Sequence, residues 1–287
     1  SNDDFPELGG DTTLEQCLKE TNEIGFSGIE AGGKFPKNSN ELIPKLEKEN
    51  LKLCSGWYGA NLLKNTVKEE ILIMKDQLNL FKECNAPCMV VAEVSGSIQG
   101  KVKIPLSKRP ILNMDEWKTF YNKISEISKY MEDSGVPLAY HHHMGTVVQS
   151  QEDTERLIDN TSDTVKLLID TGHMMFAGGD FDKIAKDYSS RLHHVHCKDI
   201  RKDVLDTSLK NDLSFIDAFF AGAFTVPGDG CIDYENFLKI LKNFNYKGWL
   251  VVEAEQDPKK ANPFEYGKIG FNHLKKIALD CGFEITR

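Results

Sequence analysis

The chain has 287 residues, of which 40% are hydrophobic and 28% charged, a composition that suits one large α/β domain or two small ones. Its formal net charge of −9 and the lack of a basic cluster argue against nucleic acid as a partner. No apolar run approaches the roughly 20 residues of a membrane helix, no signal peptide opens the chain and no C-x-x-C pair occurs among the seven cysteines, so we expect a cytoplasmic protein with reduced thiols.

Short apolar segments alternate with helical patterns along the chain, which is typical of βα units around a parallel sheet. The first helix is predicted to start at a capping box formed by Thr12 and Glu15. The next predicted elements are strand 28–31, helix 40–49, strand 51–57, helix 66–83 and strand 88–94. Residues 95–113 lack a periodic pattern, and because such a long loop in a compact domain is usually functional, we expect a lid there.

The second half continues the alternation. It predicts helix 115–134, strand 136–143, helix 151–158, strand 165–170, helix 181–188, strand 192–198, helix 214–220 inside the insertion 199–232, helix 233–244, strand 249–254 and helix 264–281.

About seven strands, each followed by a helix, and no linker indicate one domain over residues 1–287. A (β/α)8 TIM barrel fits this size and alternation. The count is one strand short, and residues 1–10 have the composition of a loop after a strand, so we expect the first strand to be missing from this chain. A doubly wound sheet is the alternative, although it would usually show a glycine-rich phosphate-binding turn.

One segment partly matches such a turn. Gly28, Gly33 and Lys34 fit most of a P-loop, but Phe35 stands where Ser or Thr would hold magnesium. We therefore expect Lys34 to face a substrate at a strand end.

Four consecutive predicted strands end in imidazoles or carboxylates. Because side chains alternate along a strand, three strand ends should each present a set on one face: His141 with His143, His194 with His196 and Lys198, and Glu253 with Glu255. Strand 165–170 ends in Asp170, and His173 follows one turn later. Taken singly, Asp170 could be a turn residue and the histidines could be core residues, but a lone buried Glu253 would be costly. Together these side chains suit manganese, cobalt, zinc or iron(II), with positions left open for a chelating hydroxyketone.

These motifs resemble a known family. Asp170-Thr171-Gly172-His173, His194-Val195-His196-Cys197-Lys198-Asp199 and Val252-Glu253 resemble the metal-binding strands of the xylose-isomerase-like barrels, which include sugar epimerases and endonuclease IV. Segments 32–36, 140–146 and 224–230 are more narrowly similar to the inosose dehydratases of inositol catabolism.

The resemblance implies dehydration of scyllo-inosose (2-keto-myo-inositol) to a trihydroxycyclohexane-1,2-dione, with manganese or cobalt. It implies Asp170, His196 and Glu253 as metal ligands, and it places His141 where the superfamily usually has a fourth ligand, Glu.

Dehydration beside a ketone needs a base for the α-proton, an enolate stabiliser and an acid for the leaving hydroxyl. His143 or His173 is our candidate base, because a neutral imidazole titrates near the working pH, and Lys198 or Lys34 is our candidate for protonating or orienting the leaving oxygen.

We keep three alternatives: a keto-sugar epimerase or isomerase, a nuclease similar to endonuclease IV, and a sugar-binding barrel without catalysis. The expected partner is a small polyol or ketone, with no nucleic acid and no membrane, and a homo-oligomer is left open.

Overall fold

The computed structural model describes residues 8–286. Seven strands form one sheet in the order β1-β2-β3-β4-β5-β6-β9, and every neighbouring pair is parallel. Their bounds are β1 Gly28–Ala31, β2 Lys52–Ala60, β3 Met89–Glu93, β4 Leu138–His141, β5 Lys166–Asp170, β6 Leu192–Cys197 and β9 Leu250–Val252. The strand order follows the chain without reversal, so the predicted TIM barrel is confirmed and the doubly wound alternative is wrong.

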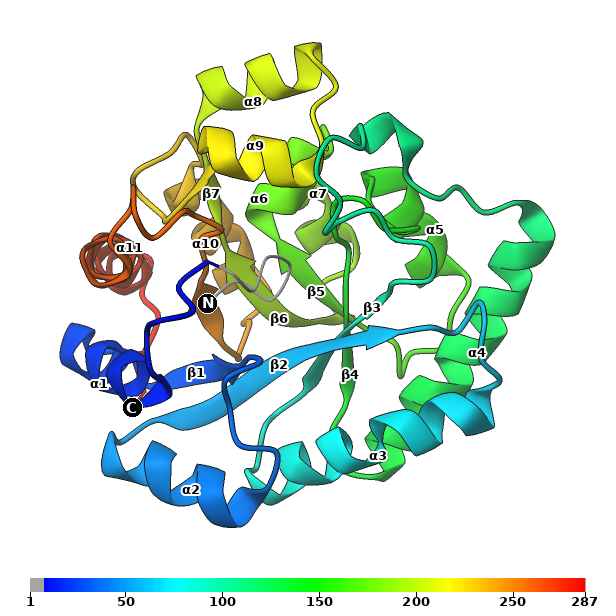
Figure 1. Cartoon of the computed structure of the whole chain (residues 1–287), viewed down its shortest axis with the longest axis horizontal. Coiled ribbons are helices and arrows are strands. Elements are labelled where there is room, and N and C mark those ends of the chain that lie inside the picture. The colour runs from blue at the N-terminus through cyan, green and yellow to red at the C-terminus, as the bar shows by residue number, and fades with distance from the viewer. Residues whose placement is uncertain (1–7, 287) are drawn as a thin grey trace.

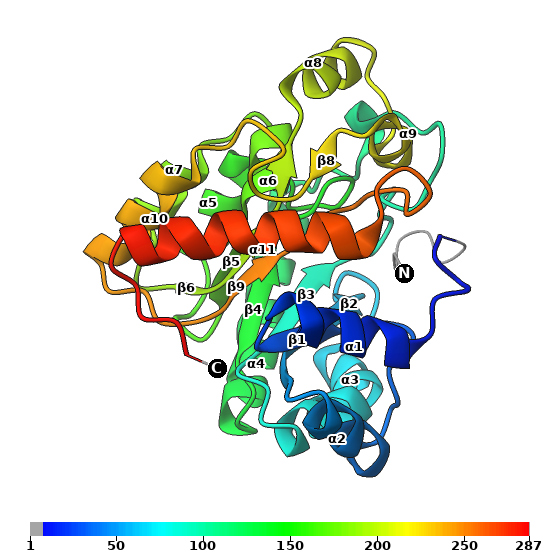
Figure 2. The same ribbon diagram turned by 90° about the vertical axis from the view of Figure 1, so that its left-hand side faces the viewer.

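The strands make an inner wall and the helices surround it (Figure 1). The helices are α1 Leu14–Ile24, α2 Ser39–Lys48, α3 Val67–Glu83, α4 Met114–Asp133, α5 Gln151–Asp159, α6 Thr171–Phe176, α7 Phe181–Asp187, α8 Lys202–Lys210, α9 Phe215–Ala221, α10 Tyr234–Asn243 and α11 Pro263–Asp280. Helix α11 crosses the outside of β9 and packs against α1 and α10 (Figure 2). Within residues 8–286, no helix combines the length and apolarity needed to cross a membrane.

The two edges of the sheet, β1 and β9, do not pair with each other in the described part of the chain. The seven observed strands agree with the predicted count. Most of the predicted loop over residues 1–10 lies outside the description, which starts at residue 8.

Several local features differ from the sequence prediction. The hydroxyl of Thr13, not Thr12, accepts the backbone N–H of Gln16 at 3.1 Å and caps α1, so the predicted capping box is wrong. Helix α6 was missed because it starts directly at the end of β5, without a loop. Helix α8, in which Leu205 and Ser208 are buried, is also absent from the predicted helices.

The two long insertions pack against each other. The N–H groups of Leu106, Ser107 and Lys103 donate to Leu213 O at 3.3 Å, Asp212 Oδ1 at 3.1 Å and Asp217 Oδ2 at 3.0 Å. The first insertion follows β3 and contains a short 3₁₀ helix, Leu106–Lys108. The second follows β6 and adds a small antiparallel sheet of β7 (Asp199–Ile200) and β8 (Phe224–Thr225). Both therefore cover the end of the barrel where the strands terminate.

At the opposite end, a buried arginine joins two strands. Arg191 precedes β6 and donates to the carbonyls of Val165 at 2.9 Å, Ser162 at 2.7 Å and Ile158 at 3.4 Å. Its guanidinium thus satisfies the carbonyl oxygens of the buried residues Val165 and Ile158 around the start of β5. Ser162 O also accepts the backbone N–H of Val165 at 3.0 Å.

Replacing Arg191 by Met should lower the free energy of unfolding by about 2–4 kcal/mol, because the carbonyl oxygens of the buried residues Val165 and Ile158 lose the guanidinium donor together. Urea unfolding measures this. The control is Arg156→Met, which removes a half-exposed guanidinium paired with Glu152 at 3.0 Å, and it should cost about 1 kcal/mol or less. Equal losses in the two variants would contradict the assigned role of Arg191.

Candidate functional site

Four strand ends bring their side chains together at the carboxyl rim of the barrel. His141, Asp170, His196 and Glu253 each offer a nitrogen or oxygen atom, and these atoms all lie within 4.8 Å of one another. The first three side chains are buried and Glu253 is partly exposed. The convergence expected from strand alternation is therefore present.

Asp170 stands at the end of β5 and serves two purposes. Its Oδ1 accepts the backbone N–H of His173 at 2.8 Å and caps α6. Its Oδ2 faces the cluster, 3.6 Å from His196 Nδ1 and 3.7 Å from His141 Nε2. Burial alone would raise the pKa of Asp170, but the Lys198 ammonium and the nearby imidazoles hold it well below its usual value. The carboxylate is therefore ionised.

The orientation of His141 is set by the backbone. Its Nδ1 lies 2.6 Å from the carbonyl oxygen of His142, which can only accept, so Nδ1 carries the hydrogen and Nε2 carries the lone pair. Burial outweighs the carboxylate of Asp170 and lowers the pKa of His141 to about 4. A neutral ring thus points a lone pair into the cluster.

His196 is oriented by a carboxylate on the first strand. Its Nε2 lies 3.1 Å from Glu30 Oε1, which also accepts from His194 Nε2 at 2.9 Å. Its Nδ1 therefore faces Glu253 Oε2 at 2.8 Å. Burial lowers the pKa of His196, but Glu30 and Glu253 outweigh it and raise the pKa well above 6.5, so a cation bound at Nδ1 would displace a proton.

These donor atoms fit a divalent cation. Among the described residues, Asp170 Oδ2, His196 Nδ1 and Glu253 Oε2 have no partner with hydrogen-bond geometry, although all three atoms are buried. The Lys198 ammonium lies 3.3 Å from each of the two carboxylate oxygens and offsets part of the cost of burying them. A metal ion would satisfy all three atoms together. Nitrogen and carboxylate donors without a thiolate suit manganese, cobalt, zinc or iron.

A second cluster adjoins the first. His143, His173 and Glu255 also offer atoms within 4.8 Å of one another. The ammonium of Lys198 lies 2.8 Å from His173 Nε2 and 2.9 Å from Glu255 Oε2. It is also 3.3 Å from Asp170 Oδ2 and 3.3 Å from Glu253 Oε2, so it bridges the two clusters.

The charges in this second cluster follow from burial and contact. Burial lowers the pKa of Lys198, but the carboxyl groups of Asp170, Glu253 and Glu255 outweigh it and raise the pKa above its usual value. Burial and the Lys198 ammonium lower the pKa of His173 well below 6.5. Burial, opposed by Lys198, raises the pKa of Glu255. The cluster therefore holds a charged lysine, a neutral His173 and a carboxyl group that takes up a proton more readily than usual.

Three of the four predicted catalytic residues lie in this second cluster: His143, His173 and Lys198. Glu255 belongs with them but was not selected from the sequence, although alternation placed it on the same strand face as Glu253. The structure does not bring Lys34 to the clusters. Its ammonium donates to the carbonyl oxygens of Gly9 at 2.6 Å, Gly10 at 3.3 Å and Thr12, so it holds the segment before α1.

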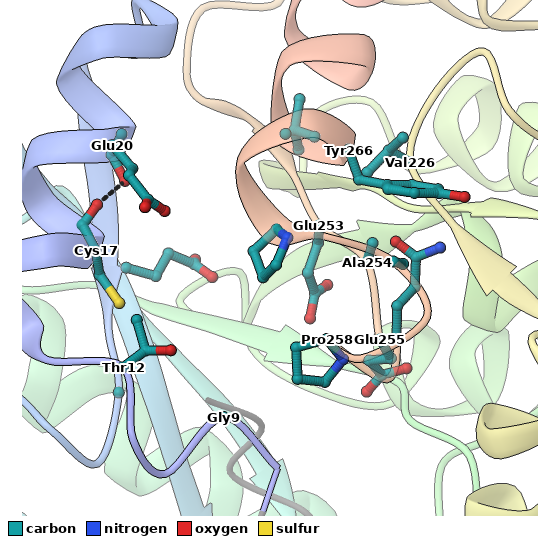
Figure 3. A pocket seen from close by; sticks show the side chains of 18 of the residues that line it. Gly9, Thr12, Cys17, Glu20, Val226, Glu253, Ala254, Glu255, Pro258 and Tyr266 are labelled. Atoms are coloured by element: carbon teal, nitrogen blue, oxygen red, sulfur yellow. Dashed lines mark hydrogen bonds between the residues drawn. The ribbon is translucent and has the colours of Figure 1, made fainter.

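A cavity of about 800 Å³ opens onto the rim. Of the two clusters, it is lined by His141, His143, His196, Glu253 and Glu255, and not by Asp170, His173 or Lys198. Figure 3 shows Glu253 and Glu255 reaching into it from the segment after β9, with Cys17 and Glu20 of α1 across from them. The volume is within the usual range for small-molecule sites.

The amino-acid sequence is similar to a known family and to two named proteins. The family described as xylose isomerase-like TIM barrel matches residues 18–277. The rhizopine catabolism protein MocC of Rhizobium meliloti is 43% identical over 286 residues, which is 100% of this chain and 88% of that protein. Inosose dehydratase 2 of Bacillus cereus is 44% identical over 268 residues, 93% of this chain and 90% of that protein.

Solved structures share the fold at low sequence identity. The IOLI protein, whose crystal structure holds a zinc atom, has a TM-score of 0.67 at 18% identity, over 94% of this chain and 93% of that one. The probable 3-DHS dehydratase AsbF of Bacillus anthracis has a TM-score of 0.68 at 13% identity, over 92% of this chain and 93% of that one.

The turn after His143 depends on a glycine. Gly145 has φ +81°, and a Cβ there would lie 2.8 Å from the backbone nitrogen of Gln99, a residue that lines the cavity. Gly96 has a similar φ of +72°, but a Cβ there would meet nothing within 4 Å among the described residues. The two positions therefore share the backbone strain and differ in packing.

We expect Gly145→Ala to lower the free energy of unfolding by about 1–3 kcal/mol more than Gly96→Ala, because only the first forces two backbone segments apart. Urea unfolding of both variants measures the difference. If the two losses are equal, the close approach at Gly145 does not constrain the turn that carries His143.

Proposed function

The chain belongs to the xylose isomerase-like TIM barrel family, and we propose that within it this protein removes water from scyllo-inosose (2-keto-myo-inositol) to give a trihydroxycyclohexane-1,2-dione. The observation that carries the proposal is the pair of clusters at the rim: a set of four candidate metal ligands, and beside it His143 and Glu255 facing the same cavity. The inosose dehydratases of Bacillus cereus supply the substrate class.

We assign His141, Asp170, His196 and Glu253 as the ligands of one divalent ion, with manganese or cobalt as our choice. When bound, such an ion supplies Lewis-acid stabilisation of the negative charge that develops on the ketone oxygen. Glu30 supports the site by holding the His196 ring so that Nδ1 points inward.

We assign His143 as the base. Its Nδ1 lies 2.9 Å from Met144 O, so Nε2 is the nitrogen that accepts a proton from the carbon next to the ketone. Its ring lines the cavity. His173 is less suited, because its Nε2 already accepts the Lys198 ammonium at 2.8 Å and its ring does not line the cavity.

We assign Glu255 as the acid that protonates the leaving hydroxyl. It lines the cavity, and burial raises its pKa, which favours its protonated form. Lys198 is enclosed behind it at 2.9 Å and positions the carboxyl group. The sequence suggested a lysine as the group that protonates the leaving oxygen. We therefore assign this role to Glu255, which Lys198 positions.

The relative position of base and acid favours dehydration over the alternative of epimerisation or isomerisation. His143 Nε2 and Glu255 Oε1 lie 3.7 Å apart and both residues line the cavity, so we propose that a bound ring meets both groups on one side. Loss of a proton and a hydroxyl from neighbouring carbons can use two groups on one side. Epimerisation returns a proton to the opposite face of the same carbon, where this pair offers no donor.

The test incubates the manganese-loaded protein with scyllo-inosose and follows the ultraviolet absorbance of the dione, with NMR of the products. A rate of absorbance increase that is proportional to the enzyme concentration, and that falls to zero after the metal is removed, supports the proposal. An isomeric keto sugar that keeps all its oxygen would assign the epimerase, and inosose that is bound and unchanged would assign a binding protein.

Replacing Asp170 or Glu253 by Ala should abolish metal binding and turnover together, because each removes a proposed ligand. Elemental analysis and the absorbance assay measure the two effects on the same samples. Glu152→Ala is the control, since it removes an exposed carboxylate from α5, and it should keep both. Turnover that survives the loss of the metal would refute the Lewis-acid role.

His143→Ala should lower kcat by about 10²–10⁴-fold while one metal ion remains bound, because general-base catalysis is worth that much. Exchange of the α-proton of inosose with D₂O should fall by the same factor. His173→Ala should instead mainly lower stability, because its ring packs against Phe215 and Phe224 at centroid distances of 5.6 and 5.4 Å. Exchange lost in the His173 variant and kept in the His143 variant would reverse the assignment.

A further inference from the structure

We infer that the ammonium of Lys198 occupies a second cation site, formed by His143, His173 and Glu255, and that this internal charge limits the protein to one divalent ion. The inference rests on the proposed metal centre of His141, Asp170, His196 and Glu253. It explains how the cluster of His143, His173 and Glu255 would stay without a metal beside the proposed metal centre.

The Lys198 ammonium lies where a second metal ion would lie if His143, His173 and Glu255 were its ligands. Nζ lies 2.8 Å from His173 Nε2 and 2.9 Å from Glu255 Oε2, in contact with two of the three members of the second cluster. It is also 3.3 Å from both Asp170 Oδ2 and Glu253 Oε2, which are proposed ligands of the first ion. Two-metal sites place their ions about 3.5–4 Å apart, and Nζ contacts two carboxylates that would also hold the first ion.

The side chain of Lys198 is built into this place. It is fully buried, and its stem passes over Gly172, where a Cβ would lie 2.7 Å from Lys198 Cγ. Its ammonium also lies 5.4 Å from the centre of the Phe224 ring. A buried lysine is costly unless it is paired, and here it meets three carboxyl groups. An ammonium and a metal ion cannot both occupy this space, so the lysine excludes the second ion.

The arrangement follows from the sequence. Lys198 stands two residues after His196, so both side chains leave the strand on the same face. The His196 side chain reaches the first cluster, and the longer Lys198 side chain reaches the second. The missing Cβ of Gly172 leaves the path for the longer stem.

The experiment counts metal ions in the full chain. Purified protein is dialysed against Mn²⁺, and the bound equivalents are measured by elemental analysis. Wild type should bind one ion and Lys198→Met should bind two, because Met fills the stem without its charge. The Mn²⁺ EPR spectrum should change from an isolated ion to an exchange-coupled pair.

Three further variants separate charge from packing. Lys198→Arg keeps the positive charge and should bind one ion. Lys198→Met combined with Glu255→Gln removes a ligand of the second site alone and should return the count to one. Lys123→Met is the control. It removes a partly buried ammonium that donates to Leu62 O and Asn65 O and contacts neither cluster, so the protein should still bind one Mn²⁺ ion.

Lys198→Met leaves the carboxyl groups of Asp170, Glu253 and Glu255 without their ammonium, so its melting temperature should rise over the titration of the second Mn²⁺ equivalent. Lys198→Gln, which keeps a neutral donor, is the second variant in case the first does not fold, and it should also bind two ions. One equivalent in both folded variants, or two in wild type, overturns the inference and leaves the proposed function standing. No equivalents in wild type would remove the metal centre and the proposed function with it.

Discussion

The carboxylate of Asp170 connects the local fold to the chemistry. One oxygen ends β5 and starts α6 by accepting the N–H of His173, and the other faces the imidazoles of His141 and His196 and the ammonium of Lys198. A helix cap and a ligand position are thereby fixed by one side chain. Because Asp170 is buried and ionised, the surrounding rim must supply positive charge, and the rest of the site follows from that requirement.

The orientation of each histidine depends on what holds its other nitrogen. Backbone carbonyls hold Nδ1 of His141 and His143, a carboxylate holds Nε2 of His196, and an ammonium holds Nε2 of His173. Only the first three rings therefore present a nitrogen toward the cavity side of the clusters. Similar imidazoles acquire different roles because their second partners differ in charge.

The sequence could predict which side chains gather at the rim, but not the partners that orient each imidazole. The repeated apolar strands predicted the barrel, and strand alternation placed four candidate ligands at one rim, where the structure brings them together. Our proposal of His143 rather than His173 as the base could not come from the sequence, because it depends on where the Lys198 ammonium lies. Helix α6 and the small β7–β8 sheet are too short to carry a period, so they could not be seen either. Both lie beside the clusters, because α6 carries His173 and β8 carries Phe224, whose ring centroid lies 5.4 Å from that of His173.

Strand β1 is linked to the site by the charged contacts of Glu30 with β6, and not, within residues 8–286, by strand pairing with β6 or β9. In the described part of the chain, β1 pairs only with β2, yet Glu30 near its end accepts from His194 and His196 of β6. Burial opposes this, but the two imidazoles lower the pKa of Glu30 and keep it ionised. The position of β1, and with it the α1 wall of the cavity, is therefore tied to the orientation of a proposed metal ligand. A rotation of the His196 ring away from the proposed metal site would therefore also break its contact with Glu30 of β1.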